Sequence, residues 1–366
     1  MKIVLSSNTS WNLVNFRLGL IKSLINEGHE VYALAPRDKY SAVLEDFGCS
    51  FEEINLKPQN KNPIREIFSF FSLFKKLYRI RSEYFLGFTI KINIFGAIVC
   101  QILKIKYILN VTGLGQSFSD KSSFLYFVAT KLYKVSLKKA DHIFFQNKND
   151  ESLFKELNLL DGLSFSVLPG SGVDIDLFKP EKKLNDGKEF SFLFLGRLQR
   201  EKGIFEYLSA ARTLSKKFNN ISFKILGNFD KKDYKVSQEI KALSELGLVQ
   251  YLGFSDKVKS IILESSCVVL PTYYREGTPR SLIEAAACGK VIITSDWIGS
   301  REVVDDGING YLVEPKNSKA LVKKMIQVLN LPEEKIKKMG EASREKAIRE
   351  FDEKIIISQY LNRIKK

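Results

Sequence analysis

Residues 270–289 read LPTYYREGTPRSLIEAAACG, and this stretch decides the fold of the second half of the chain. It begins at the end of one apolar run and is followed by another, Val291-Ile292-Ile293. Between the two runs, Thr278 as a cap, Pro279 at the first helical position and Gly289 as a stop predict a helix. A strand, a loop, a capped helix and a second strand together make one βαβ unit.

Two carboxylates flank the start of this helix. Glu276 lies in the loop before it, and Glu284 lies within it. In a βαβ unit the helix N-terminus faces the ligand crevice, where its free amides and its dipole favour a phosphate. Glu276 is then placed to reach hydroxyls on one side of a diphosphate, and Glu284 hydroxyls on the other. The pattern predicts a nucleotide-sugar site.

A second anion-binding pattern, GRLQREKG at residues 196–203, follows an apolar strand and opens a helix. Arg197 offers a fork that grips two phosphate oxygens, and Lys202 adds a point charge. A departing nucleoside diphosphate needs such fixed positive charge if no metal supplies it. By itself the pattern is more typical of a solvated turn. Ahead of the Glu276 and Glu284 unit, it favours a phosphate site.

Strands and helices alternate through two successive series, which predicts an α/β protein with two doubly wound domains. The expected boundaries are 1–172 for the first domain, 173–186 for a connector, 187–351 for the second domain and 352–366 for a last helix. Helices are expected at 15–27 and from about 318 onward. Strands are expected at 2–6, 31–35, 84–88, 107–111, 142–146, 165–168, 190–195, 222–226, 249–251, 267–270, 291–294 and 310–313.

Composition narrows the class of protein. The formal net charge of +15 requires an anionic partner, which is a nucleic acid, a membrane surface or a phosphorylated substrate. Two histidines and four scattered cysteines exclude a Cys/His zinc site and predict buried reduced thiols at Cys267 and Cys288. The opening MKIVLSS predicts a strand rather than a signal peptide, and no segment is long and apolar enough to span a bilayer. A cytoplasmic location is expected.

These motifs resemble the family 4 retaining glycosyltransferases of the GT-B fold. The resemblance is carried by GRLxxxKG at 196–203 and by EGxPxSxxEAxAxG at 276–289, with its pair of glutamates eight positions apart. PGSGVDIDLFKP at 169–180 resembles the connector of that family. The trailing family segment is matched at Gly299, Arg301, Glu302, Gly307, Asn309, Gly310 and Pro315. The resemblance implies two Rossmann-like domains facing across a cleft, with the last helix crossing back to the first domain.

The resemblance also implies roles for the residues. Arg197 and Lys202 would neutralise the donor diphosphate, Glu284 would bind the ribose, and Glu276 would bind the transferred sugar near the reacting carbon. Glu276, Arg197 and Lys202 form the implied catalytic set. The implied donor-binding set is Gly196, Arg197, Lys202, Glu276, Gly277, Thr278, Pro279, Arg280 and Glu284. Members of the family keep the anomeric configuration by front-face displacement and require neither a metal nor another cofactor.

The first half departs from the family pattern. Ser6-Ser7-Asn8 stands where many members have a Gly-Gly loop, and residues 110–115 lack the histidine found there in many members. NFRLGLIKSL at 15–24, TIKINIFG at 89–96 and TGLG at 112–115 resemble a subgroup that builds bacterial surface polysaccharides and lipid-linked oligosaccharides. The candidate acceptor-binding residues are Asn8, Arg17, Lys91, Asn93, Thr112 and Gly113, with Arg17 equally open to the role of a solvated surface residue.

The subgroup implies particular substrates. It moves an N-acetylhexosamine, such as GalNAc or GlcNAc, from a UDP-sugar donor to a sugar on undecaprenyl diphosphate. The product is an α linkage, made in O-antigen, capsule or lipid-linked oligosaccharide synthesis. Only the resemblance favours UDP over GDP. The pattern leaves the transferred sugar, the acceptor sugar and the linkage position open.

Two further motifs and two other functions are weaker matches to the sequence. Asp174-Ile175-Asp176 spells the metal-binding DxD of another glycosyltransferase fold, but it lies in the connector. GLGQSF at 113–118 lacks the third glycine of a dinucleotide fingerprint, which speaks against a dehydrogenase. A nucleotide-sugar epimerase or hydrolase would need acidic or histidine groups for proton abstraction, and a non-catalytic scaffold in a polysaccharide assembly complex would not need the four charged residues.

Two basic and aromatic segments suggest a membrane partner. They are IREIFSFFSLFKKLYRIR at 64–81 and SFLYFVATKLYKVSLKK at 123–139. Basic amphipathic helices lie in the headgroup layer of anionic membranes, which predicts a peripheral location on the inner face of the cytoplasmic membrane. The alternative is that the aromatic stripe packs on the sheet and the charges face water. The sequence shows no nucleic-acid-binding motif, so no nucleic acid partner is expected.

Overall fold

The structure is a computed structural model that describes residues 1–57, 62–118, 120–181, 189–230 and 233–364. The chain divides into two compact units. One unit comprises Met1–Gly172, Arg275–Gly277 and Glu353–Lys366, and the other comprises Val173–Tyr274 and Thr278–Asp352. Residues 182–186 of the expected connector and 365–366 of the expected last helix lie outside the described residues.

The first unit is built on a seven-stranded sheet in which every strand pair is parallel, with the order β3-β2-β1-β4-β5-β6-β7. The strand order reverses between β1 and β4, the point at which open α/β sheets bind ligands. The strands are β1 (Lys2–Ser6), β2 (Glu30–Ala35), β3 (Ser50–Glu53), β4 (Tyr84–Phe88), β5 (Lys106–Val111), β6 (His142–Phe145) and β7 (Phe165–Val167).

Helices cover both faces of this sheet. One face packs against α1 (Ser10–Asn26), α2 (Ser41–Asp46) and α13 (Glu353–Ile364). The other face packs against α3 (Pro63–Ile80), α4 (Ile90–Leu103), α5 (Phe124–Leu137) and α6 (Lys148–Glu156). A short 3-10 turn, η1 (Gly115–Phe118), follows β5. Because both faces are covered, the central strands read as continuous apolar runs.

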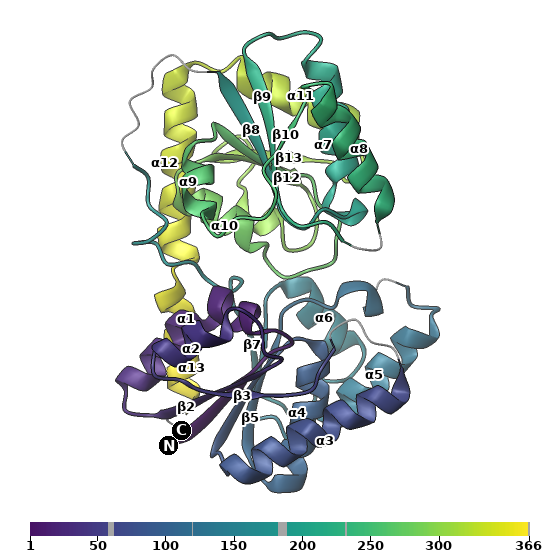
Figure 1. The fold of residues 1–366 in the computed structure, drawn as a ribbon, viewed down its shortest axis with the longest axis vertical. Coiled ribbons are helices and arrows are strands. Elements are labelled where there is room, and N and C mark those ends of the chain that lie inside the picture. The colour runs from purple at the N-terminus through teal and green to yellow at the C-terminus, as the bar shows by residue number, and fades with distance from the viewer. Residues whose placement is uncertain (58–61, 119, 182–188, 231–232, 365–366) are drawn as a thin grey trace. The chain divides into compact units, whose positions relative to one another are not determined.

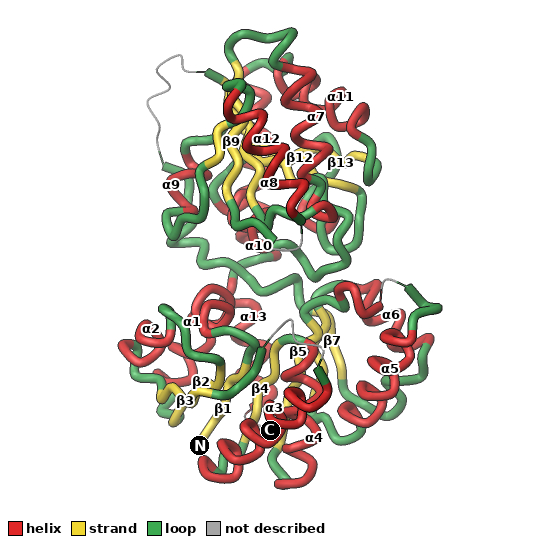
Figure 2. Tube along the Cα trace, turned by 45° about the vertical axis from the view of Figure 1, so that its right-hand side comes forward, coloured by secondary structure: helices red, strands yellow, loops and turns green. Residues whose placement is uncertain are grey.

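The second unit is also built on a parallel sheet, with six strands in the order β10-β9-β8-β11-β12-β13. Figure 2 shows the strands of both units in yellow and the helices in red. Its strands are β8 (Phe190–Leu195), β9 (Ile221–Leu226), β10 (Gln250–Tyr251), β11 (Cys267–Leu270), β12 (Val291–Ser295) and β13 (Gly310–Val313). Its helices are α7 (Ile204–Leu214), α8 (Tyr234–Glu245), α9 (Val258–Leu263), α10 (Arg280–Ala287), α11 (Ser318–Leu329) and α12 (Glu333–Glu350), with 3-10 turns η2 (Arg200–Lys202) and η3 (Arg301–Val303).

The predicted strands are confirmed to within a residue at either end, and β3 is a strand that the prediction missed. The helix expected at 15–27 begins earlier, at Ser10, because the Thr9 side chain accepts a hydrogen bond from the Asn12 amide at 3.1 Å and caps it. The thiols of Cys267 and Cys288 are buried and free, as predicted. In the described part of the chain, no helix combines the length and the apolar character needed to cross a membrane.

The start of α10 corrects the prediction for Thr278 and Pro279. Pro279 is the N-cap residue, with an extended ψ of 121°, and the helix begins only at Arg280. No side chain of the described residues caps this helix. The extended ψ of Pro279 keeps it outside the first helical turn, so Thr278 does not occupy the capping position. In that turn the Leu282 and Ile283 amides donate to the Pro279 carbonyl at 3.1 and 3.3 Å.

Candidate active site

The loop after β8 carries Arg197 and Lys202, and it is joined to the loop after β11 within the second unit. The Glu201 carbonyl accepts hydrogen bonds from the Tyr273 amide at 2.8 Å and from the Thr272 hydroxyl at 3.3 Å. Both loops leave the carboxyl ends of neighbouring parallel strands. The hydrogen bonds therefore fix the GRLQREKG segment to the segment that precedes the predicted donor helix.

Two glycines allow these loops to approach so closely. Gly203 has a φ of +79°, and a Cβ there would lie 2.1 Å from the Pro271 carbonyl oxygen. A Cβ on Gly227, which follows β9 with a φ of +157°, would lie 1.8 Å from the Gly196 carbonyl oxygen. Only glycine fits at either position. The loops after β8, β9 and β11 thus form one tightly packed edge of the second unit.

Two predicted phosphate ligands meet at one aromatic ring of this edge. The Arg197 guanidinium carbon lies 5.5 Å from the centroid of Tyr274, and the Lys202 amine lies 5.6 Å from the same centroid. Arg197 is exposed, whereas Lys202 is only 6% exposed. The ring attracts both cations and holds them near each other. Two positive charges gathered in this way suit a ligand with more than one negative charge, such as a diphosphate.

Glu284 lies on α10 and is held by Arg280. The Arg280 Nε atom donates to Glu284 Oε1 at 2.9 Å, and the Glu284 side chain is 13% exposed. Burial raises the pKa of Glu284, and the charge and hydrogen bond of Arg280 oppose that rise. An ionised carboxylate accepts several hydrogen bonds, so the bond from Arg280 leaves capacity for the two hydroxyls of a ribose.

The three residues Arg275–Gly277 group with the first unit and are fixed there by several contacts. Arg275 donates to the buried Asp150 carboxylate at 3.0 and 3.1 Å. The Gly277 amide donates to the Thr112 carbonyl at 3.0 Å, and the Asn147 side chain donates to the Glu276 carbonyl at 3.3 Å. These contacts hold the backbone of Glu276 in one conformation.

Asp150, Asn147 and Arg275 are residues that sequence reasoning missed. Burial raises the pKa of Asp150, and its bonds from Asn147 and Arg275 oppose the rise. The three residues belong to no motif, and Asp150 and Arg275 lie far apart in the sequence. The only available signal was the cap at the start of α6, where the Asp150 amide donates to the Asn147 side chain at 2.7 Å.

The predicted acceptor residues lie in two different environments. Arg17 is buried, and its guanidinium carbon lies 4.4 Å from the centroid of Phe88. Its reading as a solvated surface residue is therefore wrong. Asn93 is fully buried and donates to the Asn110 carbonyl at 2.8 Å. Both residues take part in the packing of the first unit, and their role in acceptor binding stays a prediction.

The remaining acceptor candidates are less buried. The Lys91 amine pairs with the Glu66 carboxylate at 2.7 Å. Asn8 follows β1, and Thr112 and Gly113 follow β5, so all three lie past the carboxyl ends of strands in one parallel sheet. This is the edge at which such sheets bind ligands.

The Asp174-Ile175-Asp176 segment forms a turn. One oxygen of Asp174 accepts hydrogen bonds from the amides of Asp176 and Leu177, both at 2.9 Å. The Asp174 carboxylate thus closes its own turn. Across the residues that the structure describes, no group of three or more His, Cys, Asp or Glu side chains is arranged to hold a metal ion.

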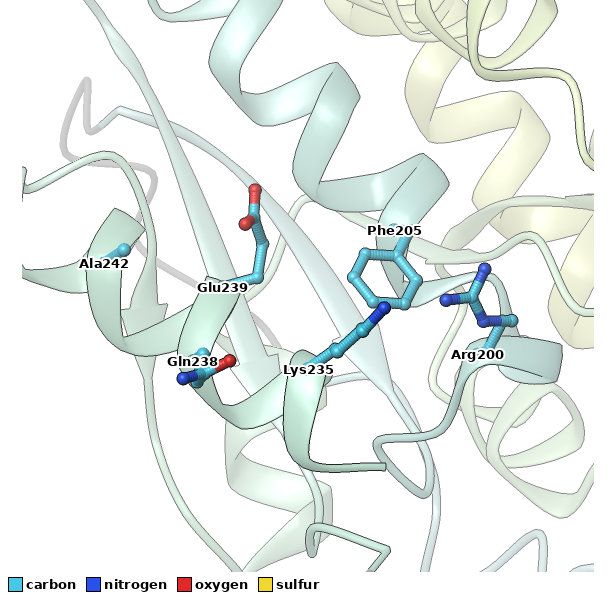
Figure 3. A pocket seen from close by; sticks show the side chains of 6 residues that line it. All are labelled: Arg200, Phe205, Lys235, Gln238, Glu239 and Ala242. Atoms are coloured by element: carbon cyan, nitrogen blue, oxygen red, sulfur yellow. The ribbon is translucent and has the colours of Figure 1, made fainter. Parts of the chain in front are cut away.

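A surface hollow lies in the second unit, at the side of α7 and α8 (Figure 3). It is lined by Arg200, Phe205, Lys235, Gln238, Glu239 and Ala242. Arg200 lies over the ring of Phe205, with 4.9 Å between the guanidinium carbon and the ring centroid. None of the predicted donor residues is among these six, although Arg200 belongs to the same GRLQREKG segment as Arg197 and Lys202.

Comparison with known proteins defines the class. The family described as "Glycosyl transferases group 1" matches residues 176–346, and the family described as "Glycosyl transferase 4-like" matches residues 2–147. A crystal structure of Anabaena Alr3699/HepE in complex with UDP and glucose is similar over 100% of this chain and 99% of that one, with a TM-score of 0.80 and 18% identity. The protein is a glycosyltransferase, and the predicted fold of two Rossmann-like domains is confirmed.

Curated relatives narrow the class further. The chain is 30% identical to a Campylobacter jejuni N,N'-diacetylbacillosaminyl-diphospho-undecaprenol alpha-1,3-N-acetylgalactosaminyltransferase, over 99% of this chain and 97% of that protein. It is 25% identical to an Escherichia coli UDP-Gal:alpha-D-GlcNAc-diphosphoundecaprenol alpha-1,3-galactosyltransferase, over 74% of this chain and 72% of that one. The chain belongs to the family 4 glycosyltransferases of the GT-B fold.

Proposed function

We propose that this glycosyltransferase moves an N-acetylhexosamine from a UDP-sugar to a sugar carried on undecaprenyl diphosphate, in α linkage and with retention. The observation that carries the donor site is the pair of cations at Tyr274, on the loop that is tied to the segment leading into α10. The position of α10 after this loop supports it, because the dipole and the backbone of a helix N-terminus favour a phosphate.

Each donor residue takes a distinct role in the proposed reaction. The bond between the anomeric carbon and the diphosphate breaks, and the acceptor oxygen bonds to the same face of that carbon. The acceptor proton passes to the departing diphosphate. Arg197 and Lys202 hold the charge that grows on the diphosphate, which lowers the barrier to its departure. Glu284 holds the ribose, and Glu276 orients the transferred sugar by its hydroxyls.

The proposed substrates rest on the named relatives. The Campylobacter relative is named for transfer of N-acetylgalactosamine to a diphospho-undecaprenol sugar, and the Escherichia coli relative for transfer of galactose to a comparable acceptor. The N-acetylhexosamine tested first is therefore GalNAc, and GlcNAc second. An acceptor on undecaprenyl diphosphate places the proposed enzyme at the inner face of the cytoplasmic membrane, as a peripheral protein.

The proposal is tested first by binding and then by transfer. A thermal-shift panel of UDP, GDP, ADP and their sugars, without added metal, is expected to show a selective rise with UDP and its N-acetylhexosamine derivatives. Transfer from labelled UDP-GalNAc to a synthetic diphosphate-linked acceptor then follows, with the anomeric configuration of the product read by NMR. A rise with GDP alone would overturn the donor assignment.

The same assay separates the alternatives. A nucleotide-sugar epimerase would change the sugar without an acceptor, and a hydrolase would release it to water at the same rate with or without acceptor. A scaffold would neither bind the donor nor turn it over. Glu276→Ala is expected to remove most of the transfer while leaving the thermal shift by UDP in place, because Glu276 is assigned to the sugar and not to the nucleotide.

We propose that transfer requires no metal ion. The positive charge beside the diphosphate would come from Arg197 and Lys202. Excess EDTA is therefore expected to leave the rate unchanged. A complete loss of transfer in EDTA that Mn²⁺ restores would contradict the proposal. Asp174 and Asp176 would then be the candidate metal ligands.

A further inference from the structure

The helix α3 is apolar on two opposite sides. Its inner side carries Leu73, Leu77 and Ile80, which are at most 4% exposed and belong to the core of the first unit. Its outer side carries large apolar side chains that are 55–64% exposed: Ile64, Ile67, Phe68, Phe71 and Tyr78. The outer residues recur at intervals of three, one, three and seven, so they form one stripe along the helix. A soluble helix normally faces water with polar residues on that side.

The helix α5 has the same character on its exposed side. Phe124, Leu125, Phe127, Leu132 and Val135 are 37–80% exposed, whereas Tyr133 and Leu137 on the opposite side are buried. Both helices pack against α4, and Figure 1 shows them on the same side of the unit. We call the exposed apolar residues of α3 and α5 the outer face. All of it belongs to the first unit.

Basic side chains accompany the outer face. Lys131 and Lys134 on α5 and Lys138 at its C-cap are exposed, at helical spacing with Phe127 and Val135. The Lys131 amine lies 5.4 Å from the centroid of the Phe127 ring. On α3, Lys75 is exposed within the apolar stripe.

Two basic side chains of the 64–81 segment form ion pairs within the first unit, and a third basic residue ends the helix. Lys76 pairs with Glu52 at 2.6 Å, and Arg79 pairs with the same carboxylate. Arg81 is the C-cap residue of the helix, in the left-handed conformation with a φ of 55°. The groups of the two segments that are best placed to meet a membrane are therefore the apolar stripe, Lys75 and the three lysines at 131, 134 and 138.

We infer that the outer face is the surface by which this protein docks on an anionic lipid bilayer, with the apolar side chains in the acyl boundary and the lysines among the headgroups. Aromatic residues interleaved with lysines suit a bilayer, because the lysine stem lies along apolar surface while its amine stays at the headgroup level. A protein partner is a poorer match, since lysine is depleted from the buried core of protein interfaces. The net charge of +15 adds long-range attraction to an anionic surface.

This inference extends the proposed function, because a lipid-linked acceptor lies in a membrane, but it is tested without any substrate. The full chain is sedimented with vesicles of phosphatidylethanolamine and phosphatidylglycerol, and separately with phosphatidylcholine vesicles. Strong binding is expected only to the anionic vesicles. If the protein binds anionic vesicles but does not transfer the sugar, the proposed function is wrong and the docking surface stands. If it transfers the sugar but does not bind vesicles, the docking surface is wrong and the proposed function stands.

Two sets of variants locate the surface. Ile67→Ser with Phe68→Ser and Phe71→Ser is expected to weaken vesicle binding at least about tenfold, through lost apolar burial. Lys131→Gln with Lys134→Gln and Lys138→Gln is expected to weaken it by about fivefold per lysine, with the loss shrinking as salt is added. All six residues are exposed, so thermal unfolding is expected to stay unchanged.

Matched controls lie in the second unit. Tyr234→Ser with Leu246→Ser removes apolar side chains that are 70–71% exposed, and Lys335→Gln with Lys337→Gln and Lys338→Gln removes exposed charges on α12. Both controls are expected to bind vesicles as the parent does. Equal losses in control and test variants would overturn the assignment. So would a dimer in solution that only the α3 variant dissociates, because the outer face would then cover a second copy of the chain.

Discussion

The donor edge of the second unit and the acceptor candidates of the first unit differ in what their polar side chains contact. At the donor edge, Arg197 and Lys202 gather at the ring of Tyr274. In the first unit, Arg17 and Asn93 are buried and contact Phe88 and Asn110. The donor cations lie on a loop that leaves a strand end, where sheets of this kind bind ligands, whereas Arg17 and Asn93 lie within helices packed on the sheet. The difference teaches that position in the fold, rather than burial alone, separates the two regions.

Removing a donor cation is expected to have the largest effect on catalysis. Arg197→Ala and Lys202→Ala should each lower kcat by about 10²–10³, because each removes fixed charge from the developing diphosphate. Thermal unfolding should shift little for the exposed Arg197, and Lys235→Ala serves as the control, since Lys235 lies on α8 and is not one of the predicted donor residues. Steady-state transfer rates check this. A kcat within about twofold of the parent for both variants would break the assignment of the donor edge.

The opposite result is expected for Asn93. Asn93→Ala removes the donor to the Asn110 carbonyl in a fully buried position, which should cost about 1–3 kcal/mol of unfolding free energy. The kcat and both KM values of the folded fraction should change little. Urea unfolding and transfer kinetics on the same preparation measure both quantities. An unchanged stability with a raised acceptor KM would restore Asn93 as an acceptor ligand.

Protonation of Glu284 is expected to make UDP binding depend on pH. Burial raises the pKa of this carboxyl against the opposing effect of Arg280, so it takes up a proton at a higher pH than an exposed glutamate does. Its ionised form is the better acceptor for ribose hydroxyls. UDP binding should therefore weaken as the pH falls, by at most about tenfold per pH unit once the group protonates.

Calorimetric titration with UDP at several pH values measures this effect. Glu284→Gln should bind UDP more weakly than the parent at neutral pH and show a flatter dependence on pH. The comparison also removes the contribution of the UDP phosphate, whose own ionisation is common to both proteins. Parallel pH profiles for the parent and the variant would exclude Glu284 from the nucleotide site.

The fold could be predicted from the sequence because parallel strands buried on both faces are continuous apolar runs, such as Cys267–Leu270. The strand β3 was missed because Ser50–Glu53 is an edge strand with mostly polar residues, which gives no apolar run. The start of α10 was misplaced because the backbone angles of Pro279, not the residue types, decide which residue caps the helix.

The candidate site could be predicted only in part, because some of its contacts join residues that are distant in the sequence. Arg197, Lys202 and Glu284 lie in motifs whose spacing follows from loop and helix geometry, so their neighbours can be inferred from nearby sequence. The burial of Arg17 depends on Phe88, and the fixing of Arg275 depends on Asp150. These partners are distant in sequence, and no local pattern encodes their contact. Motifs therefore reveal chemistry that is local in the chain and miss the contacts that support it.

The smallest expected effect concerns a histidine in the frame of the first unit. His142 is buried between two serines, with its ring nitrogens 2.8 Å from the Ser164 hydroxyl and 2.9 Å from that of Ser166. Burial, helped by the charge of Arg363, lowers the pKa of His142 from 6.5 to about 4. The histidine is therefore neutral in the folded protein over a range of pH in which the unfolded chain is protonated.

The sign of the effect on stability follows from this difference in proton uptake. Between pH 6.5 and about 4 the unfolded state binds the extra proton, so the contribution of His142 is complete above pH 6.5 and is lost as the pH falls toward 4. Urea unfolding of the parent should show this decline, and His142→Asn should show a shallower one. Neither protein should differ in the pH dependence of UDP binding, because His142 belongs to the packing of the first unit. If His142→Asn changed the pH profile of UDP binding and left stability unchanged, His142 would act on ligand binding. That result would contradict its assignment to the packing of the first unit.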